Sequence, residues 1–301
     1  MRPTIRQLQY IIAVADLGQI SAAAKQLHVS QPSLSAQLSE VEAELGSALF
    51  YRRRAGAMPT PLGEEVIRRA RRILHDLQDL RAVAQGASSF KGRLRLGVLP
   101  SIGPYLLPSV VRRLHQDHPE FRLVMREEST RDLEEGLRSG RLDMIISTPE
   151  DHPGVARYDL FEESLWLVCA SDHPLSRYEG ETPVSALRGQ TLLTLGPRHR
   201  LSHIVASLAH EVGAYLSDEY EGTSLDAIRI MAASGSGVAI VPQIYAATES
   251  RRGSEVHLSR LKQPTAKRNV ALLALHDHVS ELEMAWLATV LSNEASRLMS
   301  L

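Results

Sequence analysis

The segment that decides the fold spans residues 20–45 and reads ISAAAKQLHVSQPSLSAQLSEVEAEL. It predicts two helices joined by a turn too short for more than a tight corner. Ser30 can cap the second helix, and Pro32 suits its first turn, where a missing N–H costs nothing. The segment therefore has the form of a helix-turn-helix, whose second helix enters the DNA major groove by its N-terminal end.

The second helix of this segment has two distinct faces. One face carries apolar residues at i, i+4, i+7 and i+11 and is predicted to pack inward; these are Leu34, Leu38, Val41 and Leu45. The opposite face carries small or polar residues that allow close approach to a groove: Ser33, Ala36, Ser39 and Glu40, with Ser35 on its flank.

The flanking sequence extends this pattern on both sides. Thr4 can cap a preceding helix, which carries regularly spaced Ile and Leu residues. Residues 49–63, LFYRRRAGAMPTPLG, are basic and rich in turn-forming residues. They predict a wing, so that residues 1–61 form a winged helix-turn-helix domain.

With these flanks, the chain resembles the LysR-type transcriptional regulators. The family's signature appears as SAAA at 21–24, SQPSLS at 30–35, VEAELG at 41–46 and LFYR at 49–52, with Val-Glu for the usual Leu-Glu. Two positions depart from the family: Ala55 stands where a second wing arginine is frequent, and Ala36 where a long polar side chain often reaches a base.

The resemblance implies a sequence-specific regulator that binds double-stranded DNA. The DNA-binding residues that we predict are Gln31, Pro32, Ser33, Ser35, Arg52, Arg53 and Arg54. Gln31, Ser33 and Ser35 would contact base edges, with Gln31 suited to bidentate contact with adenine. The three arginines would hold phosphates or enter the minor groove. The family's usual output is activation of a divergent operon with repression of its own gene, so both activator and repressor roles are implied.

Residues 62–89 predict a long helix that connects two domains. Six apolar positions are spaced 4, 3, 4, 3 and 4 residues apart, as in a helix–helix seam: Val66, Ala70, Ile73, Leu77, Leu80 and Ala84. The helix either packs on its own domain or pairs with its copy in another subunit, and the second interpretation is favoured. Pairing would make a homodimer whose recognition helices reach successive major grooves of a pseudo-palindromic site. The family's usual assembly is a homotetramer, and RNA polymerase is a further partner that the resemblance allows.

Charge, apolar content and cysteine count further limit the class of protein and its expected location. Residues 1–90 hold 11 Lys and Arg against 8 Asp and Glu, whereas residues 91–301 hold 23 against 27, which fits nucleic-acid binding at one end. No apolar run of 18 residues exists and no signal-peptide core is evident, so we expect a cytoplasmic protein without a membrane partner. The single cysteine, Cys169, excludes an internal disulfide and a cysteine-rich metal site.

Beyond residue 91 the periodicity alternates between strands and helices. This pattern predicts an α/β domain with a parallel or mixed sheet. The segments 142–146 and 235–242 resemble the family's effector domain, which looks like a periplasmic binding protein with two lobes, a ligand cleft and two crossing hinge strands. We place the first lobe at 91–163 plus 269–301 and the second lobe at 164–268.

The expected effector cleft lies where strands end and helices begin, because open α/β sheets bind ligands at the carboxyl ends of strands. The predicted effector-binding residues are Ser101, Ile102, Thr130, Ser147, Arg198, His199, Arg200 and Thr223. Each of the serine and threonine hydroxyls in this set could instead serve as an ordinary helix N-cap. Arg198 or Arg200 favours a small, anionic effector.

Other classes of function lack support in the sequence. Gly235-Ser236-Gly237 lacks a P-loop lysine and suits a helix stop leading into a strand. His199 and His203 have helical spacing but no clear third metal ligand, and no nucleophile elbow indicates hydrolysis. We therefore predict no enzyme activity, metal or cofactor. A solute-binding protein would share the two lobes, but it would need an export signal and would not need residues 1–90.

Within the family, the effector region most resembles the OxyR subfamily of hydrogen-peroxide sensors, as in the segment LPSIGPYLLP at 99–108. That subfamily senses peroxide through a cysteine that follows a histidine, with a resolving cysteine further on. Here Arg200 follows His199, and position 209 is alanine. We predict that this protein does not form the redox disulfide. An oxidant response through a different mechanism remains the alternative to small-molecule control.

Overall fold

The computed structural model describes residues 3–53, 56–84, 93–119, 121–252, 255–262, 266–275 and 281–300. The chain forms two compact units, of which the first is built around residues 1–94 and the second holds most of residues 95–301. No helix among these described residues is long and apolar enough to cross a membrane.

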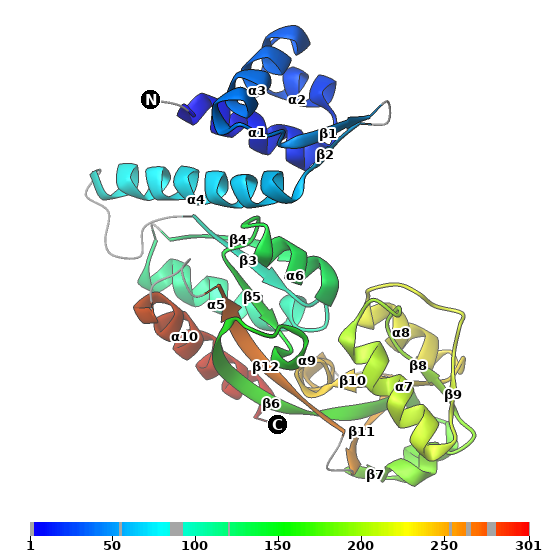
Figure 1. Cartoon of the computed structure of the whole chain (residues 1–301). Helices are drawn as coiled ribbons and strands as arrows, with labels where there is room; N and C mark the ends of the chain where they lie inside the picture. The colour runs from blue at the N-terminus through cyan, green and yellow to red at the C-terminus, as the bar shows by residue number, and fades with distance from the viewer. Residues whose placement is uncertain are drawn as a thin grey trace. The chain divides into compact units, whose positions relative to one another are not determined.

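The first unit is a helical domain with a two-stranded wing, followed by a long helix (Figure 1). Its elements in chain order are α1 (Ile5–Leu17), α2 (Ile20–Gln26), α3 (Gln31–Leu45), β1 (Phe50–Arg53), β2 (Gly56–Pro59) and α4 (Pro61–Ala84). Both predicted caps are confirmed: the Thr4 side chain accepts from the Gln7 N–H, and the Ser30 side chain accepts from the Ser33 N–H. The sequence therefore placed the starts of α1 and α3 correctly.

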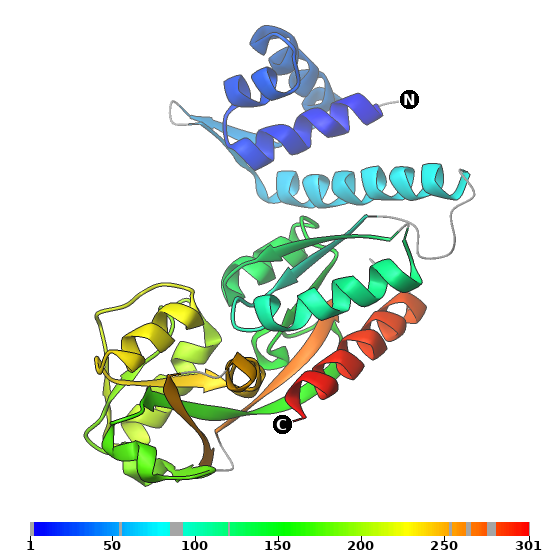
Figure 2. The ribbon, with the colours of Figure 1, turned by 180° about the vertical axis from the view of Figure 1, so that it is seen from behind.

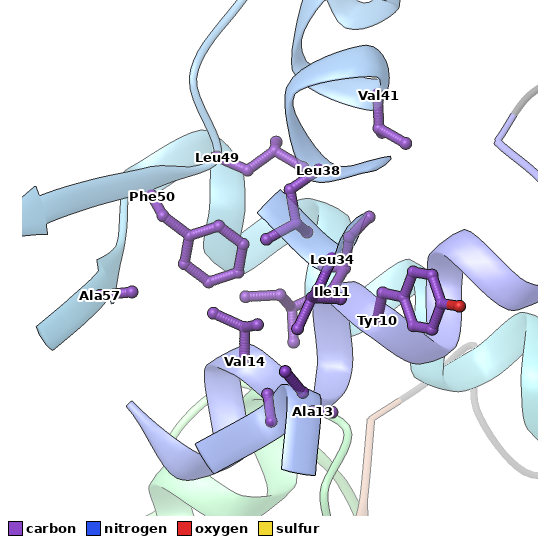
Figure 3. Packing of buried hydrophobic residues seen from close by; sticks show 13 residues of the cluster. Tyr10, Ile11, Ala13, Val14, Leu34, Leu38, Val41, Leu49, Phe50 and Ala57 are labelled. Atoms are coloured by element: carbon purple, nitrogen blue, oxygen red, sulfur yellow. The ribbon is translucent and has the colours of Figure 1, made fainter. Parts of the chain in front are cut away.

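The core of this unit lies between α1, α3 and the wing, as Figure 3 shows. Ile11 and Val14 of α1 are fully buried with Leu34 of α3. Phe50 of the wing strand β1 packs against the same cluster. The predicted inward stripe of α3 is correct for Leu34, Leu38 and Val41. It is wrong for Leu45, which is 40% exposed because the helix ends there at the left-handed Gly46.

Three local features shape the helix-turn-helix and the wing. His28, in the turn between α2 and α3, has a positive φ of 55°, which few side chains adopt. β1 and β2 pair antiparallel, with Phe50 opposite Pro59. At the start of α4 a Cβ on Gly63 would lie 2.0 Å from the Leu49 carbonyl oxygen, so only glycine allows the helix to pass the wing.

The long helix α4 changes character along its length. Ile67 and Ala70 are buried in the first unit, whereas Ile73 is 46% exposed and Leu80 is 64% exposed. The first turns of α4 therefore pack on their own domain, whereas Ile73 and Leu80 are left exposed. The predicted end of the helix at Gly86 to Ser89 lies outside the described residues.

The second unit alternates strands and helices, as the periodicity predicted. Its first part contains β3 (Arg93–Val98), α5 (Gly103–Asp117), β4 (Arg122–Glu127), α6 (Thr130–Arg138), β5 (Met144–Ser147) and the 15-residue strand β6 (Ala156–Ala170). It continues with β7 (Glu181–Pro183), β8 (Thr191–Leu193), α7 (Arg200–Val212), β9 (Tyr215–Leu216), α8 (Leu225–Ala233) and β10 (Val238–Pro242). The last elements are α9 (Gln243–Arg252), β11 (Val256–Lys262), β12 (Lys267–Ala274) and α10 (Glu281–Met299). Gly235, with a φ of 84°, separates α8 from β10 and confirms the predicted helix stop.

Two lobes share the strand β6, which changes partners along its length (Figure 1). Residues 156–164 pair antiparallel with β12 in the sheet order β4-β3-β5-β12-β6, and the remainder pairs with β10 and β11. This arrangement confirms the two-lobed α/β class with crossing hinge strands. The predicted lobe boundaries, 163/164 and 268/269, fall within β6 and β12 and stay predictions.

Helices α5 and α10 lie side by side against the first lobe, as both views of the ribbon show (Figure 2). Val110 and Leu114 of α5 and Leu287 and Leu291 of α10 are buried there. The buried residues of both helices therefore form part of the core of the first lobe.

Candidate nucleic-acid interface and ligand cavities

The N-terminal end of α3 presents its polar groups to solvent. Gln31, Pro32 and Ser33 are exposed, and the Ser30 Oγ accepts the Ser33 N–H at 3.3 Å. Proline at the start of the helix leaves no unsatisfied N–H of its own. This end of α3 therefore offers an amide side chain and a hydroxyl on a rigid support.

Arg52 ties the wing to α3. Its guanidinium donates to the Ser35 Oγ at 3.3 Å, to the Ser39 Oγ at 3.2 Å and to the Glu42 Oε2 at 2.8 Å. Its side chain is still 39% exposed. Of the other predicted wing residues, the Arg53 side chain and Arg54 lie outside what the structure describes.

Glu42 receives contacts that the sequence did not predict. Besides Arg52, its Oε1 accepts the backbone N–H groups of Leu49 at 2.9 Å and Phe50 at 3.3 Å. One carboxylate of α3 thus fixes the entry to β1. An acidic residue on a helix that is predicted to approach DNA was the available signal, because such a charge needs a cationic partner.

Glu40 is not part of the open face of α3, contrary to the prediction. Its Oε2 accepts from the Gln37 side-chain amide at 3.2 Å and from that of Gln7 at 3.4 Å. Gln7 is buried in α1. The reason for the difference is that α1 covers this edge of α3, which a helical wheel of α3 alone does not show.

The predicted effector residues divide between two cavities of the second unit. A cavity of about 490 Å³, here called the acidic cavity, is lined by Glu127, Ser129, Asp132, Arg198, His199 and Thr223, among others. A second cavity of about 380 Å³, here called the hinge cavity, is lined by Thr148, Leu165, Arg200, Ile204, Lys267 and Arg268, among others. Both volumes fall in the range of small-molecule sites.

The acidic cavity does not match the expected anion site. The Arg198 Nη2 lies 2.6 Å from the Asp132 Oδ1, so this guanidinium is already paired. Burial raises the pKa of Glu127, and burial, followed by the charge of Arg198, lowers the pKa of His199. Since Glu128 and Glu221 also line this cavity, carboxylates outnumber its basic groups.

Four predicted effector residues line neither of these two cavities. The Ser101 Oγ accepts from the Arg268 Nη1 at 2.8 Å, and the Ser147 Oγ lies 2.8 Å from the His152 Nε2. Ile102 is fully buried, and its N–H donates to the Leu99 carbonyl at 2.9 Å. Thr130 begins α6, with its Oγ1 buried. Strand-end groups were expected in the cleft, but at Ser101, Ile102 and Ser147 the surrounding structure satisfies them internally.

A buried ion pair joins the two hinge strands. The Arg268 Nε donates to the Glu163 Oε1 at 2.7 Å, with the two side chains 1% and 0% exposed. The Glu163 Oε2 also accepts the Ile244 N–H at 3.0 Å. Sequence reasoning missed this pair, although Glu163 and Arg268 are charged residues within largely buried strands, which was a usable signal.

His152 connects Ser147 to the carboxylate of Glu134 through its two ring nitrogens. The order Ser-His-Glu matches a hydrolase triad, but Ser147 is fully buried. A nucleophile must reach its substrate, so this chain of hydrogen bonds serves packing in the first lobe. His203 is likewise engaged, its Nε2 lying 2.8 Å from the Pro197 carbonyl oxygen.

Cys169 is fully buried in β6. Burial, with a smaller contribution from the charge of Asp172, raises the pKa of its thiol to about 11. A thiol with this pKa is almost entirely protonated near neutral pH, and the thiolate is the reactive form. Arg200 and Ala209 stand at the two positions that the resemblance associates with redox cysteines.

A winged helix-turn-helix next to a two-lobed α/β domain with ligand-sized cavities defines the class of two-domain DNA-binding regulators. The family comparison agrees. Residues 5–64 match the bacterial regulatory helix-turn-helix protein model of the lysR family, and residues 87–296 match the LysR substrate binding domain. The chain belongs to the LysR family of transcriptional regulators.

Individual relatives cover nearly the whole chain. The DNA-binding transcriptional dual regulator OxyR of Escherichia coli K12 is 33% identical over 271 residues, which are 89% of this chain and 88% of that protein. A full-length OxyR variant from Pseudomonas aeruginosa has a TM-score of 0.75 at 29% identity, covering 98% of this chain and 95% of that one. Full-length CbnR in complex with its target DNA has a TM-score of 0.55 at 25% identity, covering 97% and 100%.

Proposed function

We propose that this regulator reads DNA through the start of α3 and the wing, pairs through α4, and is controlled by a small anionic molecule bound between its lobes. The observation that carries the DNA-binding part is the exposed Gln31-Pro32-Ser33 end of a helix that the wing holds in place through Arg52. CbnR, a LysR family transcriptional regulator of similar fold, has a full-length structure in complex with its target DNA.

Each predicted DNA-binding residue has a defined part in this proposal. Gln31 makes a bidentate contact to an adenine, and Ser33 contacts a neighbouring base or phosphate. Ser35 and Arg52 act as a unit, since they share a hydrogen bond and Arg52 keeps an exposed edge for a phosphate. Arg53 and Arg54 extend the basic wing.

The exposed apolar residues of α4 supply a pairing surface. Ile73 and Leu80 are seven residues apart on one face, and a matching helix from a second copy would cover both. Dimerisation in turn would place two recognition helices on one pseudo-palindromic site. The relatives named as peroxide-inducible activators suggest activation as one output.

Control by a bound molecule is favoured over a cysteine redox switch. The chain has one cysteine, it is buried, and its thiol pKa is raised. A peroxide-driven disulfide within one chain needs two thiols, which this chain lacks. Domains 1–61, 62–89, 91–163 plus 269–301, and 164–268 are the units that we assign to DNA binding, pairing and the two lobes.

The experiment that tests DNA reading selects a binding site from a random duplex library with the full-length protein. Gln31→Ala is then compared with Gln26→Ala, which alters an exposed glutamine outside α3. We expect Gln31→Ala to reduce discrimination at one base pair by about 1–3 kcal/mol, with Gln26→Ala unchanged. Equal sequence preference in all three proteins would contradict the assigned role of α3.

The absence of a redox switch is tested by treating the full-length protein with hydrogen peroxide. Reducing and non-reducing mass analyses are compared with DNA affinity before and after treatment. We expect no disulfide and unchanged affinity. A Cys169-linked dimer that alters DNA binding, or a peroxide response that persists in Cys169→Ser, would favour oxidant sensing instead.

A further inference from the structure

Three hydrogen-bond donors without partners line the hinge cavity. They are the Thr148 Oγ1, the Arg200 Nε and the Arg268 Nη2, all shielded from solvent and unbonded by the described residues. The Arg200 Nη1 lies 3.2 Å from the Asp151 Oδ1, a carboxylate that does not line this cavity, and this pair leaves the Arg200 Nε without a partner. Buried polar groups are nearly always hydrogen-bonded, so a cluster of exceptions around one cavity needs an explanation. A ligand with acceptor oxygens supplies one, because each donor would then gain a partner.

Arg268 is held in a fixed orientation for such a ligand. Glu163 binds its Nε and Ser101 binds its Nη1, which leaves the Nη2 edge of a planar guanidinium unused. A guanidinium fixed on two edges loses little freedom when the third edge is bound. Planar guanidinium groups match planar carboxylates, and the resulting hydrogen bonds are charge-assisted.

Part of the cavity wall is apolar. Leu165, Ile204, Leu208 and Ala266 contribute to it, and the cavity volume is about 380 Å³. Such a wall favours a molecule with a hydrocarbon body over an inorganic anion, which would leave the apolar surface hydrated.

The other charged residues of the cavity limit the ligand to one carboxylate. The Lys267 Nζ lies 2.6 Å from the Glu162 Oε1, and the Glu150 Oε1 accepts from the Asn269 Nδ2 at 3.0 Å. These side chains are already engaged, and since Glu211 also lines the cavity, its charged groups other than Arg200 and Arg268 are net negative. A second carboxylate on the ligand would be repelled there.

We propose that the hinge cavity binds a small monocarboxylate with an apolar body, whose carboxylate bonds to Thr148, Arg200 and Arg268. The proposal rests on the proposed function and names the ligand class and the cavity. Thr148 follows β5 in one lobe, Arg200 begins α7 in the other, and Arg268 lies on a hinge strand. Binding therefore joins both lobes and the hinge, so that it favours one arrangement of the lobes over another.

Calorimetry with the full-length protein tests the proposal. The probes are hexanoate and phenylacetate, each compared with its primary amide, and inorganic phosphate. We expect saturable binding of at least one carboxylate, binding of its amide weakened tenfold or more, and no binding of phosphate. Equal binding of acid and amide would overturn the assigned chemistry, and binding of neither carboxylate would overturn the proposed class.

Matched variants locate the site. Arg200→Gln and Thr148→Val are compared with Arg198→Gln and Thr223→Val, which make the same changes in the acidic cavity. We expect affinity for the carboxylate to fall about tenfold or more in the first pair and to stay unchanged in the second. The reverse pattern would move the site to the acidic cavity.

DNA binding separates failure of this inference from failure of the proposed function. The parent protein and all four variants, which keep the buried Arg268–Glu163 pair, are also tested for binding to the selected DNA duplex without ligand. A protein that binds DNA but no carboxylate would refute the ligand class alone. A folded protein that binds no DNA would refute the proposed function itself.

Discussion

The helix-turn-helix unit and the hinge of the two-lobed unit differ in the sequence separation of the polar contacts that stabilise each of them. In the first, the Thr4 and Ser30 caps span three residues, and Arg52 reaches α3 over 10 to 17 residues. In the hinge, Arg268 bonds to Glu163 and Ser101, 105 and 167 residues away. The caps, which span three residues, can be predicted from residue spacing, whereas the contacts of the hinge exist only after the chain has returned through β12.

Burial differs between the two regions in the same way. The Arg52–Glu42 pair keeps its arginine side chain 39% exposed, whereas both members of the Arg268–Glu163 pair are at most 1% exposed. Solvent screens the attraction in the Arg52–Glu42 pair, and if one partner is removed, water can hydrogen-bond the other. Loss of one partner in the second leaves an uncompensated charge in the interior.

Arg268→Met should therefore give the largest effect on stability. We expect a loss of about 3–5 kcal/mol in the free energy of unfolding of the second unit, because Glu163 becomes a buried, unpaired charge. Urea unfolding followed by intrinsic fluorescence measures it. The double variant Glu163→Gln/Arg268→Met should recover part of the loss, and a loss below 1 kcal/mol in the single variant would break the contrast between the two regions.

The second prediction compares two leucines of one predicted stripe. Leu38→Ala should destabilise the first unit by about 2–5 kcal/mol, since Leu38 is 1% exposed in its core. Leu45→Ala should cost less than about 1 kcal/mol, since Leu45 is 40% exposed at the end of α3. Thermal unfolding of the full-length variants checks both values. Similar losses would mean that a partner surface covers Leu45.

Glu42→Gln should have a smaller effect. We expect a loss of about 1–3 kcal/mol, because one amide cannot replace a carboxylate that accepts from Arg52, Leu49 and Phe50. Ser39→Ala, which removes a single weaker contact of Arg52, is the control. If the two variants unfold alike, the wing is held mainly by its apolar residues.

The smallest expected effect is the pH dependence that arises from His199. Burial lowers its pKa below 6.5, so the unfolded chain takes up a proton at a higher pH than the folded chain does. The stability that neutral His199 contributes is complete above pH 6.5 and is lost as the pH falls through the lowered pKa. The raised pKa of Glu127 acts in the opposite direction.

Unfolding in urea between pH 7.5 and 5.5 measures this slope. His199→Gln should show a weaker loss of stability on acidification than the parent protein. An identical slope in both proteins would show that His199 protonates at the same pH folded and unfolded.

Local signals recovered most of the architecture. Caps, apolar spacing and turn residues placed α1, α3, the wing, the long helix and the alternating strands and helices of the second unit. The length of β6 is not evident from the sequence, because its first half mixes polar and apolar residues like an amphipathic surface strand. The prediction missed Glu40, whose partners Gln7 and Gln37 depend on the crossing of α1 and α3.

The candidate site was predictable only in its residue types. Arg198, His199, Arg200 and Thr223 do line cavities, yet neighbours in sequence separate into different ones, with Arg198 in the acidic cavity and Arg200 in the hinge cavity. Side chains that are close in sequence at the start of a helix point in different directions, so a shift of one or two positions changes which cavity a side chain reaches.

The amino-acid sequence by itself determined the family, the helix-turn-helix, the two-lobed class and the lack of a second cysteine. These depend on spacing and composition, which a single chain carries in linear order. The tertiary structure alone decided which polar groups are satisfied, that Ser101 and Ser147 are occupied internally, and that Thr148, Arg200 and Arg268 meet around one cavity. The physical reason is that hydrogen-bond satisfaction depends on distances between residues that only the folded chain brings together.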